Sequence, residues 1–218
     1  MPATVSCAKI SGCFGTVPVG HWYSLQEDGV QKRCQCGCFG DETEFATASG
    51  SITGTDLIAQ YSTEGARLLS LDSISSRTHS ERDINCVIFG PEKELVFEVT
   101  TVSGRKVTIS SQHPVLIVDH SGEVLAVKAA SKMAVGEFVL AEDGVADRVV
   151  SIQQKPYTQR MFNFNLASTD AQNHFIPAKR IVLGDNAWQQ RLASVDARIL
   201  LRADLVKELS KSEGDQKS

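Results

Sequence analysis

The chain has 218 residues, of which 42% are hydrophobic and 22% charged, and a formal net charge of −4. This length and composition suffice for one full hydrophobic core with appendages, and the small net charge of mixed sign gives no basis for binding nucleic acid or an anionic membrane surface. No apolar run approaches the roughly 18 to 20 residues that span a bilayer, and residues 1–12 lack the charged start and apolar stretch of a signal peptide. We therefore expect a folded protein without a transmembrane segment, cytoplasmic by default.

Residues 1–37 form a cysteine-rich N-terminal flank. Five of the six cysteines precede residue 40, and only Cys86 follows. A chain of this size does not need a disulfide framework, and the alternation Cys34-x-Cys36-x-Cys38 differs from the Cys-x-x-Cys knuckle that is typical of zinc. Three interpretations stay open: a metal site, a redox latch on Cys38, and ordinary free thiols. The metal site would use Cys7, Cys13, Cys34 and Cys36.

Residues 38–186 are a succession of short alternating or β-branched runs. The runs cover residues 67–71, 86–89, 95–102, 106–110, 115–118, 123–128, 137–141 and 148–153. Turn residues such as Gly90-Pro91, Ser103-Gly104 and Asp143-Gly144 separate them. Hairpin turns at this spacing predict an all-β domain.

The pattern changes after Asn186. Large apolar residues recur at mostly three- or four-residue steps up to Leu209, and no proline intervenes. This spacing predicts an amphipathic helix from Trp188 to Leu209, whose apolar stripe docks on the β-domain. The stripe consists of Leu192, Val195, Ile199 and Val206. A polar tail ends the 187–218 segment.

Cys38 is the strongest candidate for chemistry. A thiol is the best intrinsic nucleophile among the side chains, and the preceding Gly37 leaves its own carbonyl sterically open to attack. A second string, Gly12-Cys13-Phe14-Gly15, repeats the Gly37-Cys38-Phe39-Gly40 pattern and makes Cys13 a rival. Only Cys38 is followed by the spacing of Thr43, Phe45 and Gly50 described next.

Five stretches resemble, in order, the Hint module, the self-processing domain shared by inteins, bacterial intein-like domains and the C-terminal half of hedgehog-type proteins. They are Cys38 with Thr43 and Phe45; the turn Ala48-Ser49-Gly50-Ser51; residues 96–113, which end in Ser110-Ser111-Gln112-His113; residues 132–140; and residues 162–164 with 173–178 and 182–186. Ser110 stands where the family's Thr-x-x-His motif usually has threonine.

The resemblance implies a pseudo-symmetric β-fold of short strands over residues 38–186, followed by a C-terminal helix. It implies single-turnover autoprocessing, similar to a cysteine peptidase, with the chain's own N-terminal segment as substrate and no cofactor. Cys38 would attack the Gly37-Cys38 peptide bond, and His113, whose ordinary pKa suits an acid or a base, would assist. Ser110 would donate to the same amide. The alternative for His113 is a structural histidine at a strand end.

The closing block resembles the family's second catalytic region but departs from splicing inteins. His174 matches a catalytic or orienting position, with packing in a loop as the alternative. Asn186 matches the residue that cyclises in the last splicing step, but Asp185 replaces the assisting histidine and Ala187 has no nucleophile to accept an acyl group. We therefore expect no splicing. Whether Asn186 cleaves or caps the following helix stays open.

A hedgehog-like outcome remains, in which water or another small nucleophile resolves the thioester. Residues 85–91 contain no acid that could activate a sterol hydroxyl, so we do not expect sterol transfer. Two other hypotheses compete with autoprocessing: a degenerate Hint fold that serves as a binding or structural module, and a cysteine-rich metal-binding protein.

Overall fold

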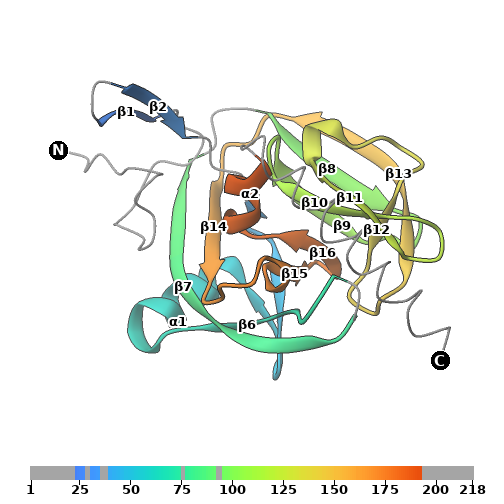
Figure 1. The fold of residues 1–218 in the computed structure, drawn as a ribbon, viewed down its shortest axis with the longest axis horizontal. Helices are drawn as coiled ribbons and strands as arrows, with labels where there is room; N and C mark the ends of the chain where they lie inside the picture. Colours follow the sequence, from blue (N-terminus) through green and yellow to red (C-terminus); the bar gives the residue numbers. More distant parts are fainter. Residues whose placement is uncertain (1–22, 28–29, 35–38, 75–76, 92–94, 193–218) are drawn as a thin grey trace, which may run out of the picture.

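The computed structural model describes residues 23–27, 30–34, 39–74, 77–91 and 95–192. The prediction of an all-β domain is confirmed: strands dominate, and the described part adds helices α1 (Gly54–Glu64) and α2 (Asn186–Leu192) with two short 3-10 turns, η2 (Ala130–Lys132) and η3 (Ala171–Asn173) (Figure 1). None of the helices in these ranges is long and apolar enough to cross a membrane.

The strands follow one another through short connections. They are β1 (Tyr23–Glu27), β2 (Val30–Cys34), β3 (Phe39–Gly40), β4 (Glu44–Thr47), β5 (Gly50–Thr53), β6 (Arg67–Leu71), β7 (His79–Pro91), β8 (Val96–Thr101), β9 (Lys106–Ser110), β10 (Pro114–Val118), β11 (Val124–Ala129), β12 (Phe138–Leu140), β13 (Ala146–Lys155), β14 (Arg160–Leu166), β15 (Phe175–Ala178) and β16 (Ile181–Gly184). β1 and β2 form their own antiparallel hairpin within the N-terminal flank.

The other fourteen strands form one curled antiparallel sheet. Its order is β5-β4-β15-β16-β10-β12-β13-β8-β9-β3-β14-β7-β6, with β11 paired to β10. Two long strands make the curl possible: β13 pairs first with β12 and then with β8 across a bulge, and β7 pairs with both β14 and β6. A bulge sharpens the local twist, so the sheet closes around its apolar face instead of staying flat.

The short strand β3 lies at a central place in this order. Phe39 pairs with Ile109 of β9 on one side and with Phe162 of β14 on the other. Because its two neighbours are separated by more than fifty residues in the sequence, the position of β3 depends on the whole sheet. The residue that follows Cys38 is therefore held by tertiary structure and not by a local turn.

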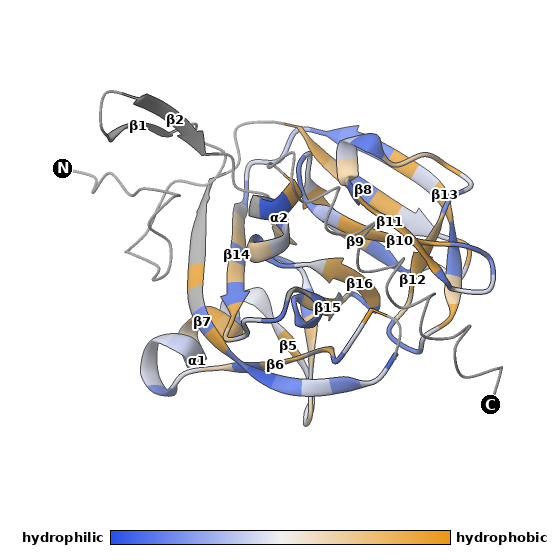
Figure 2. Cartoon of the chain, viewed as in Figure 1, coloured by the Kyte–Doolittle hydropathy of each residue, from blue (hydrophilic) through white to orange (hydrophobic). Residues whose placement is uncertain are grey.

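The core has two parts. The larger contains a cluster of phenylalanine rings in which Phe39 meets Phe45 edge to face at 5.0 Å and stacks on Phe164 at 5.7 Å between ring centroids. The smaller lies between the β10–β12–β16 strands and α2, and includes Leu116, Phe175 and Trp188. Figure 2 agrees, since hydrophobic residues gather on the inner strands such as β10 and β16, while the first part of β7, along the lower edge of the view, is mostly hydrophilic.

The sequence located most of the strands. The runs predicted at 67–71 and 106–110 coincide with β6 and β9, the other predicted runs overlap β7, β8 and β10–β13, and the turn at Ala48-Ser49 joins β4 to β5. Helix α1 was missed, although its capping signal is present: Thr53 Oγ1 accepts from the Asp56 amide at 3.2 Å and donates to its carboxylate at 2.7 Å. Strands β14–β16 were not predicted as strands either.

The predicted C-terminal helix is described only in its first part. Helix α2 begins at Asn186, close to the expected start, and ends at Leu192, where the described residues end. Trp188 provides its buried contact with the sheet, whereas Val195, Ile199 and Val206 of the expected stripe lie outside the described residues. The division into segments 1–37, 38–186 and 187–218 therefore stays a prediction.

Candidate functional site

The predicted junction, Gly37-Cys38, lies outside the described residues, so the site is built from Phe39 onward. Cys38 is bonded to Phe39, and a trans peptide places consecutive Cα atoms about 3.8 Å apart. Phe39 is fully buried and fixed by its pairing with β9 and β14. Whatever acts on Cys38 is therefore found around the place where β3 begins.

His113 lies directly against Phe39. It ends a tight turn after β9, in which its amide donates to the Ser110 carbonyl at 3.1 Å, and its ring centroid is 4.1 Å from that of Phe39. The side chain has no exposed surface, and no hydrogen bond of regular geometry satisfies either ring nitrogen among the described residues. A buried polar group without a partner costs free energy, so its presence calls for an explanation.

Burial also determines the charge of His113. Complete desolvation lowers its pKa to about 3, against the opposing effect of the nearby Gly184 carbonyl. The imidazole is therefore neutral at pH 7. The expectation that His113 keeps its ordinary pKa is therefore wrong: the buried ring is a weak base at pH 7, and its imidazolium, once formed, readily gives the proton up.

Two hydroxyl residues of the opening and His-containing motifs are buried near these strands. Ser110 closes β9 and is 4% exposed, and its carbonyl receives the His113 amide as described. Thr43 has no exposed surface, and its Oγ1 has no hydrogen-bond partner in the described part of the chain. Its amide donates to the Gly40 carbonyl at 3.0 Å, so Thr43 belongs to the turn that leaves β3.

The same turn is held by residues that the sequence did not point to. The Tyr157 hydroxyl accepts from the Asp41 amide at 3.1 Å and donates within a cluster formed by the carboxylates of Asp41, at 2.6 Å, and Glu42. Burial, followed by these two acceptors, raises the pKa of Tyr157. A Cβ at Gly40 would come within 2.7 Å of Glu42 Oε2 and 2.8 Å of the tyrosine oxygen, so a larger residue here would displace the ends of these two side chains.

His174 and Asp185 form a buried pair. His174 Nδ1 is 2.7 Å from Asp185 Oδ2, and Nε2 is 3.0 Å from the Ser168 carbonyl oxygen. Burial by itself would lower the pKa of His174, but the hydrogen bond and charge of Asp185 together with the Ser168 carbonyl raise it overall. Both ring nitrogens face acceptors, an arrangement that suits the protonated imidazolium.

Asp185 also starts helix α2. Its Oδ1 accepts from the amides of Ala187 at 2.8 Å and Trp188 at 3.4 Å, and its Oδ2 accepts from the Leu166 amide at 2.9 Å. The suggestion that Asn186 caps this helix is therefore wrong, because the aspartate one residue earlier accepts from the first free amides. Asn186 is the first helical residue, is 2% exposed, and its Nδ2 has no partner among the described residues.

The segments that carry His113 and Asp185 come together at the end of β16. Strand β10 begins at Pro114, next to His113, and Val115 pairs with Leu183 of β16. A Cβ on Gly184 would lie 2.8 Å from Pro114 and 2.9 Å from Trp188, so this glycine allows β10 and α2 to approach each other. The fold thus brings the Ser110–His113 turn, which contacts Phe39, and the Asp185–Asn186 junction to the same end of β16.

A further polar pair in this region was missed by the sequence reasoning. Asn163 on β14 is fully buried between Phe162 and Phe164, and its Nδ2 donates to Gln189 Oε1 of α2 at 3.4 Å. A polar residue between two phenylalanines of a strand was the available signal, because alternate strand residues face opposite sides.

The described residues offer no metal centre. They contain no group of three or more His, Cys, Asp and Glu side chains that could hold an ion. The metal hypothesis rested on Cys7, Cys13, Cys34 and Cys36; Cys34 ends β2 without a described side chain, and the other three lie outside the described ranges.

The burial of neutral His113 predicts a pH dependence of stability. With its pKa lowered from 6.5 to about 3, the unfolded chain binds a proton between these values that the folded chain does not. The free energy of unfolding should therefore fall as the pH drops below about 6.5, by up to about 1.4 kcal/mol per pH unit from this one group. The free energy of unfolding can be measured by urea titration at a series of pH values. Below about pH 6.5 it should fall less steeply with decreasing pH in His113→Gln than in wild type. His120→Gln, at an exposed turn, should retain the wild-type slope, and equal slopes for all three would contradict the burial argument.

Comparison with known proteins identifies the architecture. No protein-family model and no curated protein sequence matches the chain. Solved structures do: a DnaB intein from Synechocystis sp. PCC 6803 (TM-score 0.54, 15% identity, covering 68% of this chain and 98% of the intein), a bacterial intein-like domain from Clostridium thermocellum (0.55, 18%, 68% and 98%) and the TvoVMA intein (0.56, 17%, 67% and 96%). At these identities the likeness concerns the fold, and nearly the whole of each intein is covered. The chain therefore has the Hint-type fold of inteins and bacterial intein-like domains.

Proposed function

We propose that the chain cleaves itself once, by an N-to-S acyl shift at Gly37-Cys38. Cys38 Sγ bonds to the Gly37 carbonyl carbon, the Gly37–Cys38 carbon–nitrogen bond breaks, and the thiol proton ends on the departing amine of Cys38. Water or another small nucleophile then displaces the thiolate and releases a fragment that ends at Gly37. The chain's own N-terminal segment is thus the substrate, and no cofactor is needed.

The observation that carries this proposal is the contact of His113 with Phe39. It brings a neutral imidazole with two unsatisfied nitrogens against the residue bonded to Cys38. A ring with a pKa of about 3 is a weak base towards the thiol, so its part is to contact the scissile amide and to pass the proton to the amine nitrogen as the bond breaks. A catalytic role would explain why the fold buries two ring nitrogens without regular hydrogen bonds, although this burial lowers the stability of the folded state.

The Asp185–Asn186 end supports a reaction without a second cleavage. Asp185 holds the start of α2 through the Ala187 and Trp188 amides, and Trp188 is buried against the ring of Phe175 at 4.9 Å between centroids. Cyclisation of Asn186 would break the peptide bond inside this capped, packed turn. Breaking this turn would expose the Trp188 side chain to water, and the burial of one large apolar side chain contributes about 1.5 to 3 kcal/mol to stability.

A second candidate is a Hint fold that has lost turnover and serves as a binding or structural module. The His174–Asp185 pair favours it, since both nitrogens of the second candidate histidine are engaged in holding α2. The third hypothesis, a cysteine-rich metal-binding protein, has no observation in its favour from the described residues.

The nucleophile can be tested by mass. Freshly expressed wild type should release a fragment that ends at Gly37, faster with millimolar dithiothreitol or hydroxylamine, because thiols and strong amines capture thioesters but not amides. Cys38→Ala should remain one intact chain, while Cys13→Ala should still cleave. Cleavage that persists in Cys38→Ala would exclude Cys38, and an intact wild type under all conditions would favour the module without turnover.

His113 can be tested by rate. His113→Ala should slow release of the fragment by about 10² to 10⁴, the usual contribution of a positioned acid or base. His120→Ala serves as the matched control, because His120 lies at an exposed turn, and should cleave at the wild-type rate. A folded His113→Ala protein that cleaves as fast as wild type would leave His113 with a purely structural role.

The C-terminal junction predicts continuity. The chain should remain unbroken from Cys38 through Asn186 into α2 at neutral pH, because Ala187 cannot accept an acyl group and Asp185 is engaged as a helix cap. Peptide mapping by mass spectrometry checks this. Accumulation of a peptide that starts at Ala187, and its disappearance in Asn186→Ala, would show that cleavage at Asn186 occurs.

A further inference from the structure

Asn163 occupies the face of β14 opposite to the phenylalanine cluster. Phe39 and Phe162 are cross-strand partners and point to the same side, where Phe164 also lies. Since successive strand residues alternate, the Asn163 side chain points to the other side of the β3–β14 pair. This is the side that α2 covers, because α2 contacts β14 (Figure 1). Asn163 has no exposed surface there.

Gln189 meets Asn163 from α2. It is 3% exposed, and its Oε1 accepts the Asn163 Nδ2 at 3.4 Å. Asn163 Oδ1 in turn accepts from the Phe164 amide at 2.8 Å, so its amide plane is fixed from both ends. A buried polar pair of this kind is costly unless its members are well oriented.

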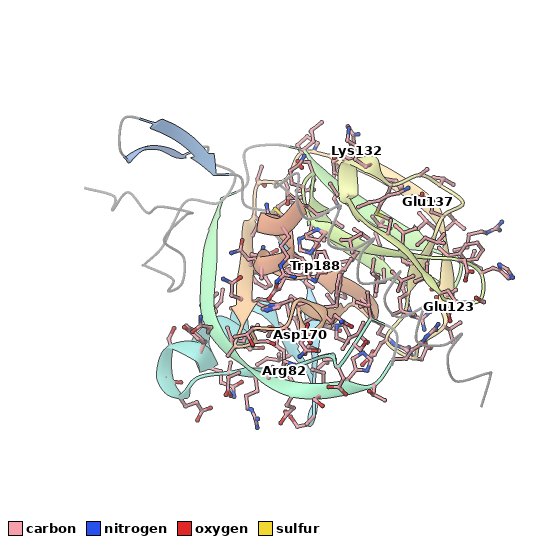
Figure 3. All side chains as sticks on the ribbon, in the orientation of Figure 1. Arg82, Glu123, Lys132, Glu137, Asp170 and Trp188 are labelled. Carbon is pink, nitrogen blue, oxygen red and sulfur yellow. The ribbon has the colours of Figure 1, made fainter. Side chains whose placement is uncertain are left out.

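Helix α2 is anchored firmly enough to fix Gln189. Asp185 caps it, and the Gln189 amide donates to the Asp185 carbonyl at 3.2 Å. Trp188, which lies towards the middle of the molecule in Figure 3, packs on Phe175, and the Arg191 guanidinium lies 5.6 Å from its ring centroid. Gln189 is thus placed by a capped and packed helix, although it lies beyond the closing block of the self-processing motifs.

We infer that Gln189 is a positioning residue for the Cys38 site and acts through Asn163. The inference rests on the proposed function and extends it to the segment after Asn186. Cys38 directly precedes Phe39, and Asn163 directly follows the strand partner of Phe39. The amide that Gln189 holds therefore borders the start of β3 on the face away from the Phe39 ring. Holding it still keeps the reacting groups in register, where a displacement of about 1 Å can cost about 10² in rate.

The test compares Gln189→Ala with Gln189→Glu in the full chain. Glutamate keeps the length and the Oε1 acceptor for Asn163, whereas alanine removes both. We expect Gln189→Ala to slow dithiothreitol-induced release of the fragment ending at Gly37 by about 10 to 100-fold, and Gln189→Glu to remain within about threefold of wild type. Asn163→Ala should match Gln189→Ala, and the double variant should be no slower than the slower single, since the two residues act as one unit.

Gln60→Ala is the matched control, because Gln60 is an exposed glutamine in helix α1. It should cleave at the wild-type rate. Wild-type cleavage by Gln189→Ala, or equal slowing by Gln189→Ala and Gln189→Glu, would overturn the inference. Thermal unfolding is measured for each variant, and if Gln189→Ala does not fold, a loss of rate in folded Gln189→Glu overturns it.

A second measurement separates this inference from the proposed function. Alkylation of Cys38 by iodoacetamide, followed by peptide mapping, does not require cleavage. We expect Gln189→Ala to accelerate this alkylation by at least about threefold, because the strand end beside Asn163 should open more often once Asn163 is released, and we expect Gln189→Glu and Gln60→Ala to leave it unchanged. If wild type never cleaves, the proposed function fails, yet this pattern would retain Gln189 as a residue that positions Cys38. The same alkylation rate in all variants would overturn that too.

Discussion

The structure depends on how Phe39 is held. Its ring lies at the centre of a phenylalanine cluster, and its backbone pairs with β9 and β14, two strands that come from distant parts of the sequence. Removing a buried phenylalanine of this kind costs about 3 to 5 kcal/mol. Because Phe39 pairs with both β9 and β14, most of the fold must be in place before the start of β3 is fixed. The candidate nucleophile is the residue before it. Any chemistry at Cys38 therefore has the folded sheet as a precondition.

The two faces of the β3–β14 pair carry different groups. On the apolar face, burial strips His113 of its charge and leaves its nitrogens unsatisfied. On the other face, Asn163 and Gln189 are hydrogen-bonded to each other under α2. The two groups have different proposed roles. The neutral His113 ring would exchange a proton, and the hydrogen-bonded amides of Asn163 and Gln189 would keep the start of β3 in place.

The two buried histidines are in opposite electrostatic environments. His113 has an aromatic neighbour and the Gly184 carbonyl nearby, but desolvation prevails and its pKa falls. His174 is also buried, but a carboxylate and a carbonyl face its two nitrogens, and its pKa rises. The His174–Asp185 pair stabilises the start of α2, whereas the neutral His113 ring lies beside β3. Stabilisation and candidate chemistry are thus divided between them.

Local patterns in the sequence were enough for the all-β class, for the strands β6 and β9 and for the motif residues, because alternation and turn residues act over a few positions. The capping signal of Thr53 and Asp56 would have given α1 by the same means. Only the tertiary structure decided that His174 pairs with Asp185, that Asp185 and not Asn186 caps α2, and that Asn163 meets Gln189. The His174–Asp185 and Asn163–Gln189 contacts join residues eleven and twenty-six positions apart in different segments. Their geometry follows from the curl of the sheet and the docking of α2, which no local pattern specifies.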